Sequence, residues 1–299
     1  MRYKVYRKTL RSLKEALTMG SNEAQIEFWN GEVGERWAKR NHIMENMLRP
    51  ITDALFEHAK INATSAADIG CGCGNQTLSL ADHLGGKATV TGFDISRPML
   101  ELARKQLAEA PRPGVSFVEA DVSQYAFPSG AFDLLFSRFG VMFFDDPLTA
   151  FINLRSALAE GGTMLFSCWQ GAENNPWIKI PMQAALKHVP PPPKPDPHAP
   201  GPFAFADSER VTEIFKQAGF ANVRFSPHKV SMNFSESHSL AEGVRILAEV
   251  GPISGLIAEQ EEPVRDLVYR ELETVLAPFY KNNTITLEGN TWFVTASAG

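Results

Sequence analysis

Between residues 65 and 170, short apolar runs alternate with segments of helical periodicity, and this alternation restricts the fold more than any other feature of the chain. Apolar runs predict buried strands at 65–71, 87–96, 114–121, 131–140 and 163–170. Helical spacing predicts helices at 75–84, 97–110 and 147–162. Strands joined by crossover helices form a parallel sheet with helices on both faces. The sequence therefore predicts an α/β fold that binds its ligand beyond the carboxyl ends of the strands.

Three glycines, Gly70, Gly72 and Gly74, occupy every second position in AADIGCGCGNQTLSLA, directly after the first predicted strand. Glycine used in this way lets the backbone turn sharply or approach a ligand closely. The order departs from the dinucleotide fingerprint G-x-G-x-x-G, because Asn75 stands where the last glycine would be. Asp94, at the end of the second strand, suits the ribose of any nucleoside. These residues alone leave an NAD-linked oxidoreductase open.

The composition excludes several classes. The chain has 299 residues and a formal net charge of −5, which gives no sign of a nucleic-acid-binding surface. No apolar run approaches membrane-spanning length, and no secretory signal is visible. The three cysteines, Cys71, Cys73 and Cys168, lack the spacing of a disulfide framework, which favours a cytoplasmic protein. Cys71 and Cys73 have no accompanying pair or histidine cluster, so no metal site is predicted.

Three further segments carry a resemblance to a known family. ADIGCGCG, with Asp68, resembles the first motif of class I S-adenosylmethionine-dependent methyltransferases. EADVSQYAFPSGAFDLLFSRFGVMFF resembles their later motifs, and TITLEGNTWFVTASA resembles their last strand. FWNGEVGERWAKRNHIMENMLRPI is similar to a bacterial branch often labelled ubiquinone/menaquinone-methyltransferase-like. The resemblance covers roughly residues 22 to 299 and implies a Rossmann-like, seven-stranded, mostly parallel sheet with an antiparallel last strand and an added helical lid.

The resemblance also implies a cofactor, S-adenosyl-L-methionine, and residues to bind it. Asp94 is expected to bind the ribose, because a carboxylate at the end of the second strand can take both hydroxyls. Asp121 is expected beside the adenine amino group. Ile95, Met99 and Val122 are expected to form the apolar slot for the adenine ring, and the alternative for these three residues is core packing. The glycine loop is expected to take the methionine end, and the end of the fourth strand to face the reacting methyl. The complete predicted set is Asp68, Gly70, Cys71, Gly72, Gly74, Asp94, Ile95, Met99, Asp121, Val122, Ser137, Trp29 and Trp37.

The predicted reaction is methyl transfer to the oxygen, nitrogen or carbon of a small molecule by in-line displacement. Proximity drives such a transfer, so no general base is assigned, although His228, His238 and His198 are candidates. Arg138 is a further candidate for a catalytic role. Arg138 pairs either with an acceptor carboxylate or with Asp145 or Asp146. The place where amino-directed nucleic-acid methyltransferases carry Asn- or Asp-Pro-Pro-aromatic reads SRFG, so nucleic acid is not expected. The predicted substrate pocket comprises Arg138, Phe139, Trp169, Phe203 and Phe205.

The domain organisation follows from the same segments. Residues 1–21 form a basic extension, in which the first 18 residues carry six Lys or Arg and one Glu. Residues 22–62 form a helical lid, and residues 63–299 form the cofactor-binding domain. Two inserts, at about 174–207 and 237–281, cap the substrate side, and the second, read as two helices broken at Gly251-Pro252, alternatively makes a homodimer contact. An NAD-linked oxidoreductase and a non-methylating S-adenosylmethionine-binding protein remain the alternative functions.

Overall fold

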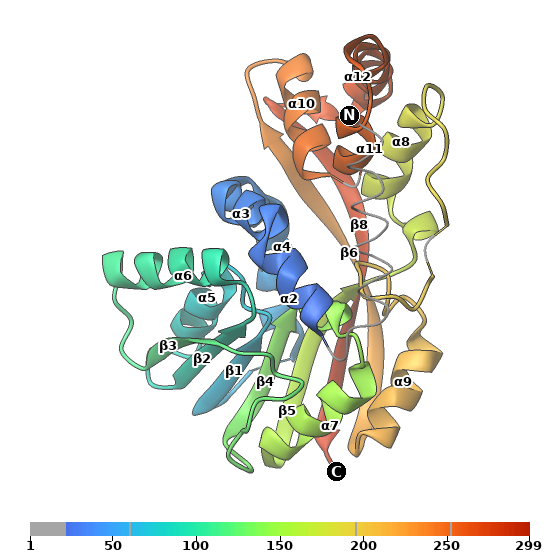
Figure 1. Cartoon of the computed structure of the whole chain (residues 1–299). Coiled ribbons are helices and arrows are strands. Elements are labelled where there is room, and N and C mark those ends of the chain that lie inside the picture. The colour runs from blue at the N-terminus through green and yellow to red at the C-terminus, as the bar shows by residue number, and fades with distance from the viewer. Residues whose placement is uncertain (1–21, 60, 195, 252) are drawn as a thin grey trace.

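The computed structural model describes residues 22–299 apart from residues 60, 195 and 252 (Figure 1). The predicted basic extension at 1–21 lies outside the described residues. The helices are α2 (Glu23–Asn30), α3 (Glu32–Lys39), α4 (Asn41–Ala59), α5 (Asn75–His83), α6 (Arg97–Glu109), α7 (Pro147–Ala157), α8 (Pro176–Ala185), α9 (Ser208–Gln217), α10 (Leu240–Val250), α11 (Ser254–Ala258) and α12 (Glu262–Leu276). The strands are β1 (Ser65–Ile69), β2 (Thr89–Asp94), β3 (Val115–Glu119), β4 (Phe132–Arg138), β5 (Leu158–Trp169), β6 (Phe220–Glu236), β7 (Tyr280–Lys281) and β8 (Thr284–Ala298).

The strands form one sheet in the order β3-β2-β1-β4-β5-β8-β6, and the two-residue β7 pairs with β8 outside this path. Strands β1 to β5 pair in parallel, whereas β8 is antiparallel to both β5 and β6. The predicted mostly parallel, Rossmann-like sheet with an antiparallel last strand is confirmed. In the described residues it has eight strands rather than the predicted seven, because the short β7 also pairs with β8. The chain order places β1 beside β4, so the carboxyl ends of these strands open a crevice at a topological switch point.

Helices cover both faces of the sheet, as the side chains of β4 and β5 demonstrate. Phe136 pairs in register with Leu165, and its ring lies 5.5 Å from that of Phe56 in α4. Phe166, one position further along β5, contacts Phe151 of α7 and Phe215 of α9. Because neighbouring positions in a strand point to opposite faces, α4 lies on one face and α7 and α9 lie on the other.

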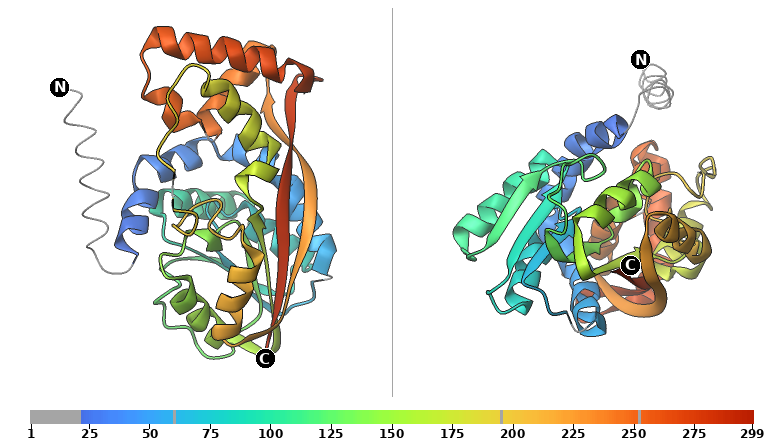
Figure 2. Two further views of the ribbon diagram at one scale, coloured as in Figure 1. Left: turned by 90° about the vertical axis from the view of Figure 1, so that its right-hand side faces the viewer. Right: turned by 90° about the horizontal axis from the view of Figure 1, so that it is seen from below.

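A second lobe rises from the long antiparallel pair of β6 and β8. These strands continue past the end of the parallel sheet. The helices α8, α10, α11 and α12 gather around their extension, at the top of Figure 1 and of the left view in Figure 2. We call these four helices the cap lobe. Arg40, which follows α3, forms an ion pair with Glu249 of α10, so the N-terminal helices are connected to the cap lobe.

Two element boundaries differ from the sequence prediction. The helix predicted over 147–162 ends at Ala157, because Leu158 already pairs with Phe132 at the start of β5. The second insert was expected to hold two helices broken at Gly251-Pro252. Its described residues instead form three helices, α10, α11 and α12. Among the described residues, no helix combines the length and apolar character needed to cross a membrane.

Candidate functional site

A cavity of about 320 Å³ opens beyond the carboxyl ends of β1, β2 and β4. The glycine loop forms one wall, the helices α2, α3 and α4 cover it, and the cap lobe closes its far end. Of the residues predicted for the cofactor and the substrate, the cavity brings together Trp29, Trp37, Gly70, Cys71, Gly72, Asp94, Ile95, Met99, Asp121, Val122, Arg138, Phe139, Trp169 and Phe203. Most of the predicted site residues therefore meet around one space.

The glycine loop needs its glycines for two different reasons. Gly70 has φ +68°, and a Cβ on it would stand 2.7 Å from the Cα of Gly140, so two backbone segments touch there. Gly72 has φ +54°, and a Cβ on it would meet only the sulfur of Met99, at 3.7 Å. The backbone at Gly72 therefore faces open space in the cavity, as required where a ligand lies against the main chain.

Asp94 is held in a fixed orientation on the cavity wall. Its Oδ2 accepts from the backbone N–H of Gly72 at 2.7 Å, and its Oδ1 accepts from the backbone N–H of Ser96 at 2.8 Å. Burial raises the pKa of Asp94, and the two backbone hydrogen bonds oppose that shift. A carboxylate has about four lone-pair directions, so each oxygen keeps the capacity to accept from a ligand hydroxyl.

Asp68 lies behind the wall rather than on it. It is fully buried, and it accepts from the Gln76 Nε2 at 3.0 Å and from the Thr77 hydroxyl at 2.6 Å. Burial raises its pKa to about 6, against the lowering effect of these hydrogen bonds. Asp68 thus connects β1 to the first turn of α5 and supports the glycine loop. Gly74 and Ser137 also lie behind the lining, and the Ser137 hydroxyl donates to the carbonyl of Ile69.

Helices α2 and α3 are fastened over the loop that follows β2. The Ser96 hydroxyl donates to the carbonyl of Trp29, and the Asn30 Nδ2 donates to the carbonyl of Ile95. The ring of Trp29 makes edge contacts with Trp37 at 6.1 Å and with Phe143 at 5.1 Å. These bonds hold the two tryptophans against the side of the cavity where Asp94 lies.

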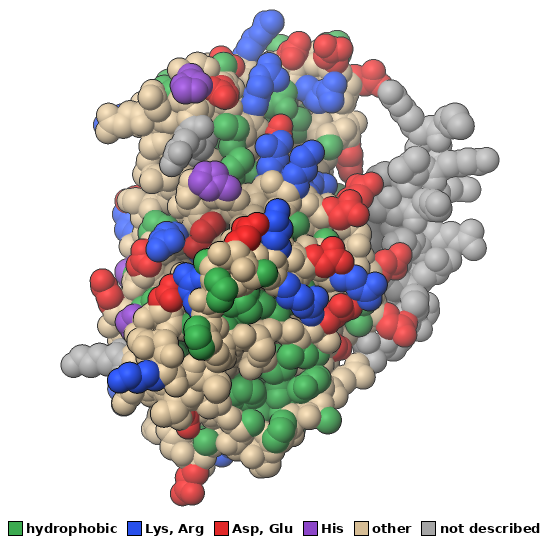
Figure 3. Space-filling model, turned by 90° about the vertical axis from the view of Figure 1, so that its left-hand side faces the viewer, with side chains coloured by type: hydrophobic (Ala, Val, Ile, Leu, Met, Phe, Trp, Pro, Cys, Tyr) green, Lys and Arg blue, Asp and Glu red, His purple; other side chains and the backbone are tan. Residues whose placement is uncertain are grey.

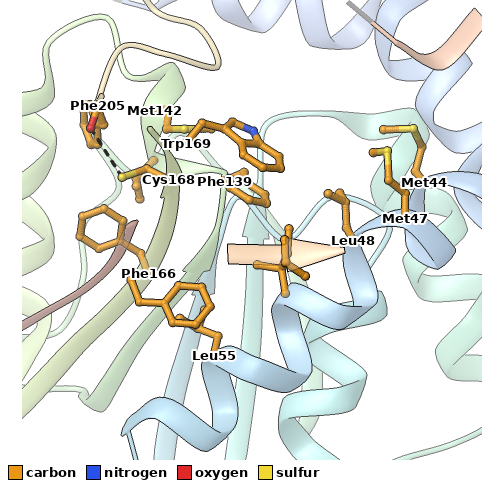
Figure 4. Close-up of a cluster of buried hydrophobic side chains, with 14 of the residues drawn as sticks. Met44, Met47, Leu48, Leu55, Phe139, Met142, Phe166, Cys168, Trp169 and Phe205 are labelled. Carbon is orange, nitrogen blue, oxygen red and sulfur yellow. Dashed lines mark hydrogen bonds between the residues drawn. The ribbon is translucent and has the colours of Figure 1, made fainter. Parts of the chain in front are cut away.

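The far part of the cavity is an apolar chamber with aromatic walls. Phe139, which has φ +64°, lies flat on Trp169 at a centroid distance of 4.2 Å and an interplanar angle of 8°. Trp169 in turn contacts Trp177, at 4.9 Å. Figure 4 shows Phe139 and Trp169 facing the side chains of Met44, Met47 and Leu48 on α4. The walls of this chamber therefore consist mainly of apolar and aromatic side chains.

Arg138 is the cation of this chamber, and its partner differs from the prediction. Its Nη2 donates to the Glu45 Oε2 at 2.9 Å, and its Nη1 donates to the Thr52 hydroxyl at 2.8 Å. The alternative that Arg138 pairs with Asp145 or Asp146 is therefore wrong. Its position at the end of β4 brings it opposite α4. Sequence reasoning missed Glu45, since the two residues are 93 positions apart.

Three other predictions of the site are corrected by the structure. Phe205 does not reach the chamber: it is 1 % exposed and packs against Phe151 and Phe166, and its carbonyl accepts from the Cys168 thiol at 3.6 Å. His228 lies outside the cavity lining and stacks on Phe293, where burial lowers its pKa. His238 is exposed near the start of α10, also outside the lining.

Sequence reasoning also missed much of the chamber. The cavity lining also contains residues that the sequence did not predict, namely Met44, Glu45, Met47, Leu48, Trp177, Ile178 and Val250. The apolar spacing within residues 41–59 was a usable signal, because it marks a helix with a buried face. Nothing local in the sequence indicates which end of that face borders a cavity.

A family model described as "Methyltransferase domain" matches residues 66–162. A trans-aconitate 2-methyltransferase of Afipia carboxidovorans is 35% identical over 130 residues, which are 43% of this chain and 48% of that protein. A demethylmenaquinone methyltransferase of Lactococcus lactis is 26% identical over 184 residues, 56% of this chain and 70% of that protein. The chain thus spans about half the length of the trans-aconitate relatives it matches.

Solved structures agree on the fold. The YcgJ protein from Bacillus subtilis superposes with a TM-score of 0.53, at 15% identity, over 82% of this chain and 97% of that one. Phosphoethanolamine N-methyltransferase 2 of Haemonchus contortus, in complex with phosphomonomethylethanolamine and S-adenosylhomocysteine, gives a TM-score of 0.50 at 19% identity, over 83% of this chain and 52% of that one.

Proposed function

We propose that this chain binds S-adenosyl-L-methionine and transfers the methyl group to a small molecule. A family model described as "Methyltransferase domain" matches residues 66–162, and the fold is similar to that of a phosphoethanolamine N-methyltransferase in complex with S-adenosylhomocysteine, which supports this proposal. The observation that carries this proposal is the single cavity wall shared by Gly72, Asp94 and Asp121. The open face of Gly72 suits a chain lying on the backbone, and the fixed carboxylate of Asp94 suits a pair of ribose hydroxyls.

The remaining cofactor contacts follow from the lining. Ile95, Met99 and Val122 line the same cavity as Asp94 and Asp121, and we propose that they form an apolar slot for a planar base. The Asp121 Oδ1 accepts from the backbone N–H and the hydroxyl of Ser123, which fixes this side chain as a candidate acceptor for the adenine amino group. We propose that α2 to α4 form the lid over the cofactor, with Trp29 and Trp37 against it.

The cofactor, when bound, supplies a methyl group that its sulfonium already activates. The residues of this chain need to hold the acceptor close and aligned, which contributes up to roughly 7–11 kcal/mol to such a transfer. The aromatic faces of Phe139 and Trp169 suit the positive charge near the reacting centre.

We propose that the acceptor is a small molecule with an apolar body, because the chamber is lined by methionine, leucine, phenylalanine and tryptophan side chains. The two inserts at about 174–207 and 237–281 supply Trp177, Phe203 and Val250 to this lining. Figure 3 shows Lys and Arg side chains interspersed with Asp and Glu on one face of the molecule, which suits a small acceptor better than a polyanion. The cysteines Cys71, Cys73 and Cys168 are unpaired and buried, which supports a cytoplasmic setting.

Calorimetry with the purified full chain tests the proposal. We expect binding of S-adenosylmethionine and of S-adenosylhomocysteine, and no binding of NADH. Asp94→Ala should weaken the binding of S-adenosylmethionine and of S-adenosylhomocysteine by about tenfold or more, because two charge-assisted hydrogen bonds to the ribose are lost. Asp82→Ala is the matched control: it removes an exposed carboxylate near the end of α5 that pairs with Arg112, outside the cavity lining.

Two results would contradict the proposal. If the wild-type chain binds neither S-adenosylmethionine nor S-adenosylhomocysteine, it is not a methyltransferase of this type. Binding without any release of S-adenosylhomocysteine, measured by mass spectrometry across a panel of small acceptors, would favour the non-methylating alternative instead.

A further inference from the structure

Trp169 is a buried tryptophan whose indole N–H has no hydrogen-bond partner within the described part of the chain. The residue is only 4% exposed, and a buried tryptophan usually donates this hydrogen to an oxygen. Two other tryptophans of the chain do so. The Trp177 Nε1 donates to the Asn175 Oδ1 at 3.1 Å, and the Trp292 Nε1 donates to the carbonyl of Ala206 at 3.2 Å. The N–H of Trp169 is therefore an unused donor.

The unused N–H of Trp169 is accessible from the cavity. Some described side-chain nitrogens and oxygens are both fully enclosed and unpartnered, and the Trp169 Nε1 is not one of them. This atom therefore keeps accessible surface, although the residue as a whole keeps very little. Because Trp169 lines the cavity, a ligand in the cavity can reach that surface. Figure 4 marks hydrogen bonds between the residues drawn and shows none at the Trp169 nitrogen.

The indole of Trp169 is held in one orientation by its neighbours. Phe139 lies flat on it at 4.2 Å, and Trp177 contacts it at 4.9 Å. A Cβ placed on Gly289 would stand 3.0 Å from the Trp169 Cζ3, so the six-membered ring packs against β8. The N–H belongs to the five-membered ring, at the other end of the indole. A donor fixed in this way can orient a ligand, as the few polar groups of an apolar pocket usually do.

The Trp169 N–H lies on the acceptor side of the proposed cofactor site. Trp169 ends β5, which is two strands from β1 in the sheet, so it lies about 10 Å from the strand that precedes the glycine loop. Asp94 and Asp121 follow β2 and β3, on the other side of β1. Met44 and Leu48 of α4 line the same cavity and face Trp169 in Figure 4. The donor is therefore placed for the molecule in the apolar chamber rather than for the ribose or the adenine.

We propose that the Trp169 N–H binds a carbonyl oxygen of the methyl acceptor, which makes the acceptor a flat apolar ring that carries a carbonyl group. An indole N–H can only donate, so it selects a group that accepts. A carboxylate would lose its hydration in an apolar chamber, and the only Lys or Arg among the described lining residues, Arg138, is already paired with Glu45. A neutral carbonyl avoids that cost. This inference rests on the proposed function and deepens it.

The test compares 1-indanone with indane, two bicyclic rings of similar shape of which only 1-indanone has a carbonyl. Each is titrated calorimetrically into the full chain saturated with S-adenosylhomocysteine, and the preference is the affinity for 1-indanone divided by the affinity for indane. Comparing this preference between variants cancels the difference in hydrophobicity between the probes. We expect Trp169→Phe, which keeps an aromatic ring and removes the N–H, to lower the preference about fivefold or more.

Two matched variants make the same chemical change elsewhere. Trp177→Phe alters the wall of the same cavity, but the Trp177 N–H is already bonded to Asn175, so the preference should stay even if both affinities change. Trp292→Phe changes an indole outside the lining and should keep both affinities. NMR of the indole N–H groups gives a second readout in the wild type. The Trp169 signal should move further downfield with 1-indanone than with indane, and the Trp177 signal should not distinguish the two probes.

The possible results separate this inference from the proposed function. An equal preference in the wild type and in Trp169→Phe would overturn the inference. So would a wild type that binds S-adenosylhomocysteine but neither probe, or a Trp169 signal that responds equally to both probes. A preference that Trp177→Phe lowers as much as Trp169→Phe would also contradict it, because the shape of the chamber and not the N–H would then select the carbonyl. Failure of the wild type to bind S-adenosylhomocysteine would overturn the proposed function instead.

Discussion

Replacing Asp68 by asparagine tests the electrostatics behind the glycine loop. The buried carboxyl has a pKa of about 6, against an ordinary value of 3.8. A pKa raised by folding means that the folded state holds this proton more firmly than the unfolded state. The contribution of Asp68 to stability is therefore fully present below pH 3.8 and is lost as the pH rises through about 6. A shift of this size corresponds to about 3 kcal/mol.

Asparagine retains the shape of the side chain and removes its ionisation. Its oxygen can still accept from Gln76, and its amide can donate to the Thr77 hydroxyl oxygen, which is free to turn. We expect the free energy of unfolding of Asp68→Asn to gain about 2 kcal/mol relative to the wild type between pH 4.5 and pH 7.5.

Urea unfolding of both proteins across this pH range measures the difference directly. All other titrating groups are shared, so their effects cancel in the comparison. A difference that stays constant to within about 0.5 kcal/mol would refute the reasoning, because the carboxyl would then be ionised equally in both states.

Three shorter predictions follow from the same geometry. Gly70→Ala should destabilise the fold by more than about 2 kcal/mol, whereas Gly85→Ala, which has a similar φ but no atom within 4 Å, should cost only about 1 kcal/mol in urea unfolding. Arg138→Met should cost about 3–5 kcal/mol, since Glu45 remains buried without its partner, and equal stability of this variant and the wild type would contradict the pairing. Burial raises the pKa of Cys73 to about 12, so iodoacetamide at pH 8 should alkylate it at least about a hundredfold more slowly in the native protein than in urea.

The parts of this protein that the sequence predicted depend on local chemistry. The strands β1 to β5 could be located because apolar runs of that length have few alternatives. Gly70 and Gly72 could be identified because their left-handed conformations exclude most side chains. Asp94 could be placed at the cavity because strand ends in a parallel sheet meet at one edge.

The acceptor chamber could not be predicted from the local sequence. Glu45 meets Arg138 only because α4 crosses the sheet at the end of β4. Phe205 is buried because its ring packs against Phe151 of α7 and Phe166 of β5. The cap lobe brings Trp177 and Val250 to the same space from segments far apart in the chain. Sequence alone determined the strands, the glycine turn and the carboxylate beside it, because each follows from conformational limits within a few residues. Only the tertiary structure decided the pairing of Arg138 with Glu45 and the walls of the chamber, because the packing of distant elements sets which side chains share a cavity.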